Sequence, residues 1–238
     1  MKGIVLAGGN GSRLAPLTSA GINKHLLPVG RQPMIFWPIQ KLVQAGIKDI
    51  MLVTGKEHAG SVINCLGSGK DLDCKLTYRV QDEAGGIAQA LSLARGFTYG
   101  ERMCVVLGDN MFLDPLSSYI EEYALQERGA RVILKAVPDP QRFGVPELDA
   151  KGNISLIEEK PQNPKSEYAV TGIYMYDQRV FDIISRLRPS ARGELEITDV
   201  NNEYLAWGEL QYSVFSGWWS DAGTHESLKL ANSLAGEL

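Results

Sequence analysis

A glycine-rich turn near the N-terminus is followed by two basic residues. An apolar run leads into Gly8, Gly9 and Gly11, and Arg13 and Lys24 come next along the chain. Because glycine has no Cβ atom, such a turn lets backbone N–H groups approach an anion closely, and the basic side chains supply positive charge to the same anion. A tight turn without a ligand is the alternative for the glycines alone. Arg13 and Lys24 favour a phosphate-binding loop.

Two better-known phosphate loops do not explain this segment. The Walker A pattern needs Gly-Lys-Ser/Thr after a four-residue spacer, and no stretch of the sequence supplies it. The dinucleotide-binding fingerprint needs a third glycine three residues after Gly11, and Leu14 occupies that position. The segment therefore needs another explanation, and the residues that follow it supply one.

Residues 8–34 resemble the signature of the sugar nucleotidyltransferases, which join a nucleoside triphosphate to a sugar 1-phosphate. That signature reads Gly-Gly-x-Gly-Thr/Ser-Arg-Leu-x-Pro-x-Thr, then Lys-x-Leu-Leu-Pro-Val and Lys/Arg-x-Pro-Met, and this chain has Ser12 at the variable position. A match of this length is far more specific than a lone glycine motif. The resemblance implies that Arg13 and Lys24 are catalytic. It also implies nucleotide contacts from Leu6, Gly8, Gly9, Gly11, Ser12 and Arg13.

Two aspartates match the family elements that hold Mg²⁺. Asp109 follows a glycine just past an apolar run, and Asp221 lies in a Trp-x-Asp-x-Gly-Thr stretch. Nucleotidyl transfer requires neutralised phosphate charge, and a phosphate-bound Mg²⁺ takes one or two protein carboxylates. From spacing alone, Asp109 also fits a turn or N-cap, and Asp221 fits a helix start for which Thr224 is the better cap. The resemblance favours both as metal ligands, with Asp109 also catalytic and in contact with the nucleotide.

Gln81 and Gly86 are candidates for recognising the base. Gln81 ends an expected strand, and Gly86 follows after a short polar loop. In family members that transfer thymidylyl or uridylyl groups, a glutamine and a glycine backbone at these places pair with the pyrimidine edge. An amide offers a donor and an acceptor, which suits thymine or uracil. The alternative is a polar strand end at Gln81 and a helix N-cap at Gly86.

Later segments match the sugar-phosphate site of the family. Phe143-Gly144-Val145, Glu158-Glu159-Lys160-Pro161 and the stretches around residues 170–174 and 190–200 carry this match. Without the resemblance, Glu159 and Lys160 would pass as a solvated charge pair. The resemblance implies sugar-phosphate contacts from Asn110, Gly144, Glu159, Lys160, Val170, Tyr174 and Arg192.

The sequence departs from the family pattern at two of these places. Phe143 replaces a common tyrosine, which removes a hydroxyl near the sugar. His25 stands where glutamine is frequent, and it could add a phosphate donor, although a lone histidine is more often structural. Neither change touches the glycine-rich motif, but Phe143 leaves the identity of the sugar open.

Composition excludes several other classes of protein. The 238 residues are 44% hydrophobic and 22% charged, with a net charge of −4 and no clustered Lys/Arg stripe, so a nucleic-acid partner is not expected. The three cysteines lack Cys-x-x-Cys spacing, which argues against a disulfide framework or a structural zinc site. The N-terminal apolar run is too short for a signal peptide, and no run approaches a membrane span. We therefore expect a cytoplasmic protein without a membrane partner.

The elements that must position these residues follow an alternating pattern. Short apolar runs alternate with helical patterns over the first two thirds of the chain, which is typical of parallel strands with crossover helices on both faces. We expect strands at 3–6, 49–53, 76–80, 103–107, 131–137, 154–158 and 168–176. We expect helices at 33–45, 57–66, 86–95, 115–128, 178–188, 197–206 and 225–234. Pro38 should delay or kink the first helix and Gly46 should end it.

This pattern predicts a Rossmann-like, three-layer α/β/α fold with a mostly parallel mixed central sheet. Ligands of such sheets bind beyond the carboxyl ends of the strands, which places the 7–14 loop, the 81–86 loop and Asp109 on one rim. We expect a single domain over residues 1–238. Its nucleotide-binding half covers about 1–130 and its sugar-phosphate half about 131–238.

The resemblance is strongest to family members that transfer a thymidylyl group from dTTP to glucose 1-phosphate, with Mg²⁺ as cofactor. UTP, or another hexose 1-phosphate, is the nearest alternative, since Gln81 cannot separate thymine from uracil. A non-catalytic sugar-nucleotide sensor is a more distant one. We also expect a homo-oligomer. Many thymidylyl-transferring relatives are some fifty residues longer and carry a second, regulatory nucleotide site in their C-terminal helices, which we expect to be absent or weakened here.

Overall fold

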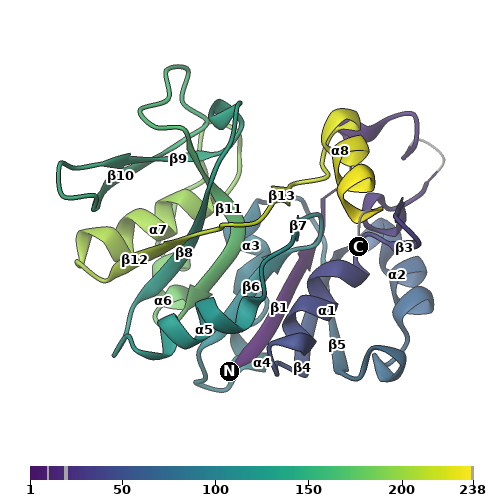
Figure 1. Cartoon of the computed structure of the whole chain (residues 1–238). Coiled ribbons are helices and arrows are strands. Elements are labelled where there is room, and N and C mark those ends of the chain that lie inside the picture. Colours follow the sequence, from purple (N-terminus) through teal and green to yellow (C-terminus); the bar gives the residue numbers. More distant parts are fainter. Residues whose placement is uncertain (10, 19–20, 237–238) are drawn as a thin grey trace.

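Nine strands of the described residues form one central sheet (Figure 1). The computed structural model describes residues 1–9, 11–18 and 21–236. The four strands that the first half contributes to this sheet, β1, β4, β5 and β6, run parallel to one another, whereas β11 enters the sheet antiparallel to β6. The strands are β1 (Lys2–Ala7), β4 (Asp49–Gly55), β5 (Lys75–Gln81), β6 (Met103–Leu107), β8 (Ala130–Ala136), β9 (Gly144–Leu148), β10 (Ile154–Glu159), β11 (Tyr168–Tyr176) and β12 (Leu210–Val214).

Helices cover both faces of this sheet. Side chains alternate along β1, so Ile4 and Leu6 pack on one face while Val5 and Ala7 pack on the other. The first face is covered by α3 (Ile87–Ser92), α6 (Val180–Ile184) and α7 (Ile197–Ala206), with α4 (Arg95–Thr98) at its end. The second face is covered by α1 (Phe36–Gln44), α2 (Ala59–Leu66) and α5 (Leu116–Ala124). The predicted three-layer fold with a mostly parallel mixed sheet is confirmed.

The last helix packs against the glycine-rich turn. α8 (His225–Ala235) follows β13 (Trp219–Ser220), which pairs with β7 (Met111–Phe112). Its buried residues Leu228 and Ala231 share a small apolar cluster with Leu14 of the turn η1 (Ser12–Leu14). The hairpin of β2 (Pro28–Val29) and β3 (Gln32–Pro33) adds Val29 to this cluster. The C-terminal helix thus supports the loop that the sequence assigns to phosphate.

The predicted strands are all present, but several predicted helices are shorter or broken. The helix expected at 86–95 is replaced by α3 and a separate α4 that runs on to Thr98, because the Ala94 N–H bonds three residues back and tightens the turn. The helix expected to reach residue 128 ends at Ala124, since Arg102 takes the carbonyls of Tyr123, Gln126 and Glu127. The helix expected at 178–188 is reduced to α6, whose flanking N–H groups also bond three residues back.

Two central-sheet strands of the second half, β9 and β12, were not predicted. Pro146 lies inside β9, and proline weakens any strand pattern because it cannot donate to the ladder. β12 carries the polar residues Gln211 and Ser213 and pairs with β8 alone. Among the described helices, none has the length and apolar character that crossing a membrane requires.

Three details of the predicted helices are confirmed. Pro38 lies in the first turn of α1, so this helix begins late, as a proline there requires. Gly46 follows its end with a φ of 80°. Thr224 is the N-cap of α8 and forms a capping box with Ser227.

Candidate active site

Two adjoining cavities lie along the carboxyl edge of the parallel strands. The larger cavity, about 510 Å³, lies between the glycine-rich turn, the 81–86 loop and the end of β6. The smaller cavity, about 160 Å³, lies between the end of β6 and the strands β9 to β11. Arg13, Asp109, Lys160 and Arg192 line both cavities. A ligand in one cavity therefore meets a ligand in the other at these charged side chains.

The larger cavity is lined by most of the residues predicted for the nucleotide. Gly11 and Ser12 do not line it. Gly11 has a φ of 66°, and a Cβ atom there would lie 2.9 Å from Lys24 Cβ, so glycine at this position allows the turn to pack closely against Lys24. Lys24 lines this cavity from η2 (Lys24–Leu26). The other predicted residues that line it are Leu6, Gly8, Gly9, Arg13, Gln81, Gly86 and Asp109.

The end of β5 fixes the amide of Gln81. Gln81 Nε2 donates to Gln89 Oε1 at 2.6 Å, and a Cβ atom on Gly8 would lie only 2.0 Å from Gln81 Oε1. Position 8 must therefore be glycine for this side chain to lie where it does. Gly86 is the N-cap of α3 with a φ of 97°, as the alternative for this residue predicted.

Asp109 is held between a cation and an amide. Lys24 Nζ lies 2.5 Å from Asp109 Oδ2, and Asn110 Nδ2 donates to Oδ1 at 3.0 Å. Burial alone would raise the pKa of Asp109, but the charge of Lys24 and these hydrogen bonds outweigh it and hold the pKa below its ordinary value. Asp109 is therefore ionised at neutral pH.

Asp221 lies beside Asp109, with Arg142 as its counter-charge. Arg142 Nη2 donates to Asp221 Oδ2 at 2.7 Å. Burial raises the pKa of Asp221, the negative charge of Asp109 raises it further, and Arg142 offsets part of this. The two carboxylates therefore repel each other across a small space, which is where a cation would be stabilised.

Gly223 leaves that space open. A Cβ atom at this position would lie 3.3 Å from Asp221 Oδ2, 3.6 Å from Asp109 Oδ2 and 3.5 Å from Arg13 Nη2. Over the described part of the chain there is no group of three or more His, Cys, Asp or Glu residues able to hold a metal ion. Two oxygen ligands facing one gap fit a Mg²⁺ ion that keeps phosphate oxygens and waters as its other ligands.

Asn110 ties three segments together at the rim. Its Oδ1 accepts hydrogen bonds from Gly172 N and Trp219 Nε1, both at 2.8 Å, while its Nδ2 donates to Asp109. A Cβ atom at Gly172 would lie 2.7 Å from the Asn110 amide. Although Asn110 lines the smaller cavity, both ends of its amide are already used, so its visible role is to position Asp109.

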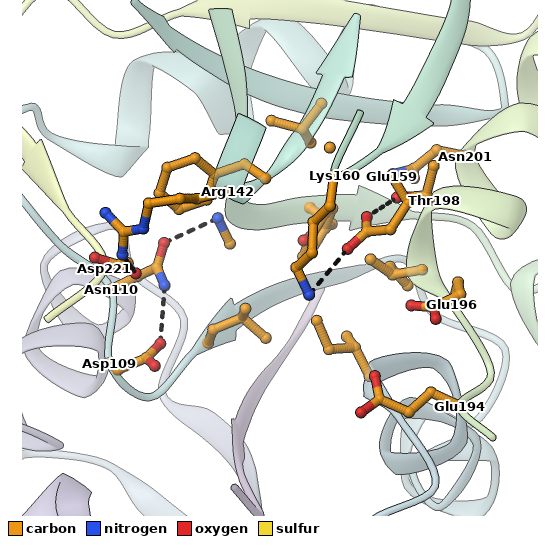
Figure 2. A pocket seen from close by; sticks show the side chains of 18 of the residues that line it. Asp109, Asn110, Arg142, Glu159, Lys160, Glu194, Glu196, Thr198, Asn201 and Asp221 are labelled. Carbon is orange, nitrogen blue, oxygen red and sulfur yellow. Dashed lines mark hydrogen bonds and ion pairs between the residues drawn. The ribbon is translucent and has the colours of Figure 1, made fainter. Parts of the chain in front are cut away.

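The smaller cavity brings together the residues predicted for the sugar phosphate (Figure 2). Glu159 Oε2 accepts a hydrogen bond from Thr198 Oγ1 at 2.6 Å, and Lys160 Nζ lies 3.5 Å from Glu159 Oε1. Arg192 Nη2 lies 3.4 Å from the same carboxylate and 2.8 Å from Glu196. The predicted residues that line this cavity are Asn110, Gly144, Glu159, Lys160, Val170, Tyr174 and Arg192, together with Asp109 and Asp221.

Comparison with known proteins decides the family. The protein-family model described as "Nucleotidyl transferase" matches residues 2–237 of this chain. The chain belongs to this family. Glucose-1-phosphate thymidylyltransferase of Neisseria meningitidis serogroup A is 45% identical over 236 residues, which are 98% of this chain and 82% of that protein. The protein of the same name from Mycolicibacterium smegmatis is 42% identical over 231 residues, or 96% of this chain and 80% of that one.

Two solved structures are similar to the fold of this nucleotidyl transferase. A Bacillus anthracis protein assigned as a glucose-1-phosphate thymidylyltransferase, in complex with a sucrose, is 58% identical with a TM-score of 0.95, over 100% of this chain and 96% of that one. A UDP-glucose pyrophosphorylase complexed with UDP-glucose has a TM-score of 0.84 at 23% identity, over 99% of this chain and 98% of that one. The second similarity supports the fold alone.

The structure of this nucleotidyl transferase favours the structural alternative for His25 over phosphate donation. His25 was considered as a phosphate donor, but its Nδ1 lies 2.9 Å from Asn23 Oδ1, an oxygen that also accepts the His25 backbone N–H. Nδ1 must therefore carry the proton. Burial and the neighbouring Lys24 lower the pKa of His25 to about 3, so the ring is neutral and its Nε2 has no proton to donate.

The sequence reasoning also missed several lining residues of the smaller cavity. Arg142 is the most consequential, because it contacts Asp221, and it precedes the quoted Phe143-Gly144 segment directly. A search for basic residues beside that segment would have found it. The others include Thr198, Glu196, Trp219 and Asn201. The first three lie in stretches already matched to the family but were not singled out, and Asn201 lies just beyond one of them.

Proposed function

We propose that this protein transfers a thymidylyl group from dTTP to glucose 1-phosphate, giving dTDP-glucose and pyrophosphate. The observation that supports this most directly is the pair of cavities that share Arg13, Asp109, Lys160 and Arg192. A nucleotide in one and a sugar phosphate in the other would place two phosphates together, as an in-line displacement requires. The names of the relatives at 42–45% identity support the substrate pair.

In the proposed reaction, a phosphate oxygen of glucose 1-phosphate attacks the α-phosphorus of dTTP. A new P–O bond forms there, the bond to the β-phosphate bridging oxygen breaks, and pyrophosphate leaves with the electron pair. Arg13 stabilises charge on the triphosphate, and Lys24 moves from Asp109 to orient and neutralise the phosphates. Asp109 and Asp221 hold Mg²⁺, which neutralises phosphate charge when bound.

The remaining residues bind and orient the two substrates. Gln81 and the backbone of Gly86 pair with the thymine edge. Gln81 Nε2 donates to Gln89 Oε1 and to Gly86 O, so Gln81 Oε1 is the atom that accepts from the base. Lys160, Tyr174 and Arg192 contact the sugar phosphate. Contacts to the sugar hydroxyls come from Gly144, Glu159 and Val170, at the wall of the smaller cavity.

Pyrophosphate release with a panel of substrates tests the proposal. We expect the highest kcat/KM with dTTP and glucose 1-phosphate, and lower values with UTP or other hexose 1-phosphates. Higher kcat/KM with UTP would replace the thymidylyl assignment by uridylyl transfer, since the Gln81 amide suits either base. Absence of pyrophosphate release with every pair would contradict the enzyme assignment and favour a sugar-nucleotide sensor.

The proposal extends to the organisation and setting of the enzyme. We assign nucleotide binding to about residues 1–130 and sugar-phosphate binding to about 131–238. In support of this, most residues that line the larger cavity come from the first range, and most that line the smaller cavity come from the second. We propose a cytoplasmic location, because the reaction consumes a nucleoside triphosphate. A homo-oligomeric state stays a prediction that sedimentation or light scattering decides.

A further inference from the structure

Arg142 has a place in the smaller cavity that the proposed reaction does not use. It ends the turn η5 (Pro140–Arg142), and Phe143 separates it from β9. Its Nη2 contacts Asp221 Oδ2 at 2.7 Å and its Nη1 contacts Asp139 Oδ2 at 2.8 Å. The guanidinium lies over the Phe143 ring, 4.9 Å from its centre. Arg142 therefore links the sugar-phosphate side of the site to a proposed metal ligand.

The oxygen that Arg142 binds is the one that faces the gap between the carboxylates. Asp221 Oδ2 is 3.3 Å from the position of a Cβ atom on Gly223, and Asp109 Oδ2 is 3.6 Å from the same point. Lys24 contacts that Asp109 oxygen in the same way. Both oxygens that face the gap are thus occupied by cationic side chains. A divalent cation entering the gap would meet these positive charges at a few ångströms.

We infer that Arg142 is a positioning residue that holds Asp221 as a counter-charge until Mg²⁺ displaces it, and that the sugar phosphate then takes up the released guanidinium. This inference rests on the proposed metal site. It extends that site by coupling metal binding to the second substrate. Arg142 competes with the metal for one carboxylate oxygen and remains beside the cavity in which the phosphate arrives.

The surroundings of Arg142 allow this exchange of partners. Its side chain is 29% exposed, and its second partner Asp139 is 38% exposed, so neither is enclosed by packing. The Phe143 ring offers a flat surface along which a guanidinium can move while remaining stacked. Lys160 and Arg192 line the same cavity and would bind an anion there. The negative charge of that anion would also attract the guanidinium of Arg142.

The inference is tested by Mn²⁺ binding to the substrate-free enzyme, followed from the electron paramagnetic resonance signal of free Mn²⁺. Mn²⁺ takes the same hard oxygen ligands as Mg²⁺. Arg142→Gln removes the competing charge, so we expect about fivefold tighter Mn²⁺ binding. Arg142→Lys keeps the charge and should stay near wild type. Unchanged or weaker binding in Arg142→Gln would overturn the inference.

Lys160→Gln is the matched control for the general electrostatic effect of removing one positive charge from the cavity. It removes one positive charge from the same cavity, from a side chain that contacts Glu159 and not Asp221. Direct competition predicts a clearly smaller effect than in Arg142→Gln. An equal gain in Mn²⁺ affinity would show a general charge effect and overturn the inference.

Addition of glucose 1-phosphate tests the second half of the inference. In the wild type the sugar phosphate should strengthen Mn²⁺ binding, and in Arg142→Gln this enhancement should be smaller. An equal enhancement in both would overturn the transfer of Arg142 to the phosphate. Asp221→Asn separates this inference from the metal site: if that variant binds Mn²⁺ as the wild type does, the metal site itself is wrong and the inference falls with it.

Discussion

At the scale of residues, the site is a balance between two carboxylates and the cations around them. Asp109 and Asp221 face one gap, and Arg13, Lys24 and Arg142 lie beside it. Pairing with Lys24 and Arg142 offsets part of the cost of burying these two carboxylates, which an unpaired charge would pay in full. The same pairing leaves the cations ready for transfer to phosphate oxygens. The site is thus prepared for anions as much as for a metal ion.

Replacing either metal carboxylate by its amide should stop the reaction without unfolding the protein. We expect Asp109→Asn and Asp221→Asn each to lower kcat by about a hundredfold or more, because a neutral amide holds Mg²⁺ poorly while side-chain volume is kept. Steady-state pyrophosphate release at saturating Mg²⁺ measures this. Asp71→Asn, an exposed carboxylate in the turn η4 (Lys70–Leu72), is the matched control. Near-normal turnover in both site variants would contradict the metal assignment.

Arg13 and Gln81 should differ in the kinetic constant that they affect. A guanidinium beside the triphosphate acts most on charge that develops in the transition state, so Arg13→Ala should chiefly lower kcat. Gln81→Ala should chiefly raise the KM for dTTP, since base pairing is made equally in the ground state. Initial rates over a range of dTTP concentrations separate the two effects. A change in KM alone for Arg13→Ala would show that its assigned role is wrong.

The buried, neutral His25 should make the protein less stable in mild acid. Its pKa is lowered by burial and by Lys24 from 6.5 to about 3, so below pH 6.5 the unfolded chain binds a proton that the folded chain excludes. Stability should therefore fall as the pH drops from 6.5 towards 3, with about 2 kcal/mol lost by pH 5. His25→Gln should remove that part of the pH dependence. Urea unfolding of the wild type and of His25→Gln at pH 7.5 and pH 5 measures how much unfolding free energy each protein loses between these pH values. An equal loss in both would contradict the prediction.

At the scale of elements, α8 connects the metal site to the glycine-rich turn. Its N-cap Thr224 lies three residues after Asp221, and its buried face packs on Leu14, next to Arg13. The helix therefore fixes both the carboxylate loop that precedes it and the turn that it covers. A substitution that weakens the start of α8 should therefore affect both the loop that carries Asp221 and the glycine-rich turn.

Loss of the capping box should show this connection. In Thr224→Ala, the Ser227 N–H loses its acceptor, and we expect a loss of about 1 kcal/mol in the free energy of unfolding. The Mg²⁺ concentration for half-maximal activity should also rise. Ser233→Ala, at an exposed position of the same helix, is the control and should change neither quantity. Chemical denaturation and a Mg²⁺ titration provide the two readouts, and an unchanged unfolding free energy in Thr224→Ala would refute the first expectation.

Local signals allowed most of these elements to be predicted, whereas contacts between distant segments were not accessible. The apolar runs that became β1, β4 and β6 and the cap at Thr224 depend on neighbouring residues, so spacing revealed them. The contact of Arg142 with Asp221 joins residues 79 apart and depends on how η5 packs against the loop after β13. Sequence spacing carries no information on such packing.

At the scale of the whole molecule, one sheet carries both substrate cavities. β11 pairs with β6 of the first half, and β8 and β9 pair with β11, so the two halves share backbone hydrogen bonds. The apolar layer on one face likewise includes Ile4 of β1 and Tyr204 of α7. Separation of the two halves would break the central sheet. We therefore expect them to unfold together.

Calorimetry of the complete chain tests this expectation of a single domain. We expect one unfolding transition. dTTP at a hundred times its Kd, with Mg²⁺, should raise the midpoint temperature of this transition by about 5–10 °C. The reason is that a ligand that binds only the folded state stabilises every part of the chain that unfolds together with the site. Glucose 1-phosphate should raise it further, whereas glucose at the same concentration, which lacks the phosphate, should have little effect. Two separate transitions, with only one of them moved by the nucleotide, would show that the halves are independent domains.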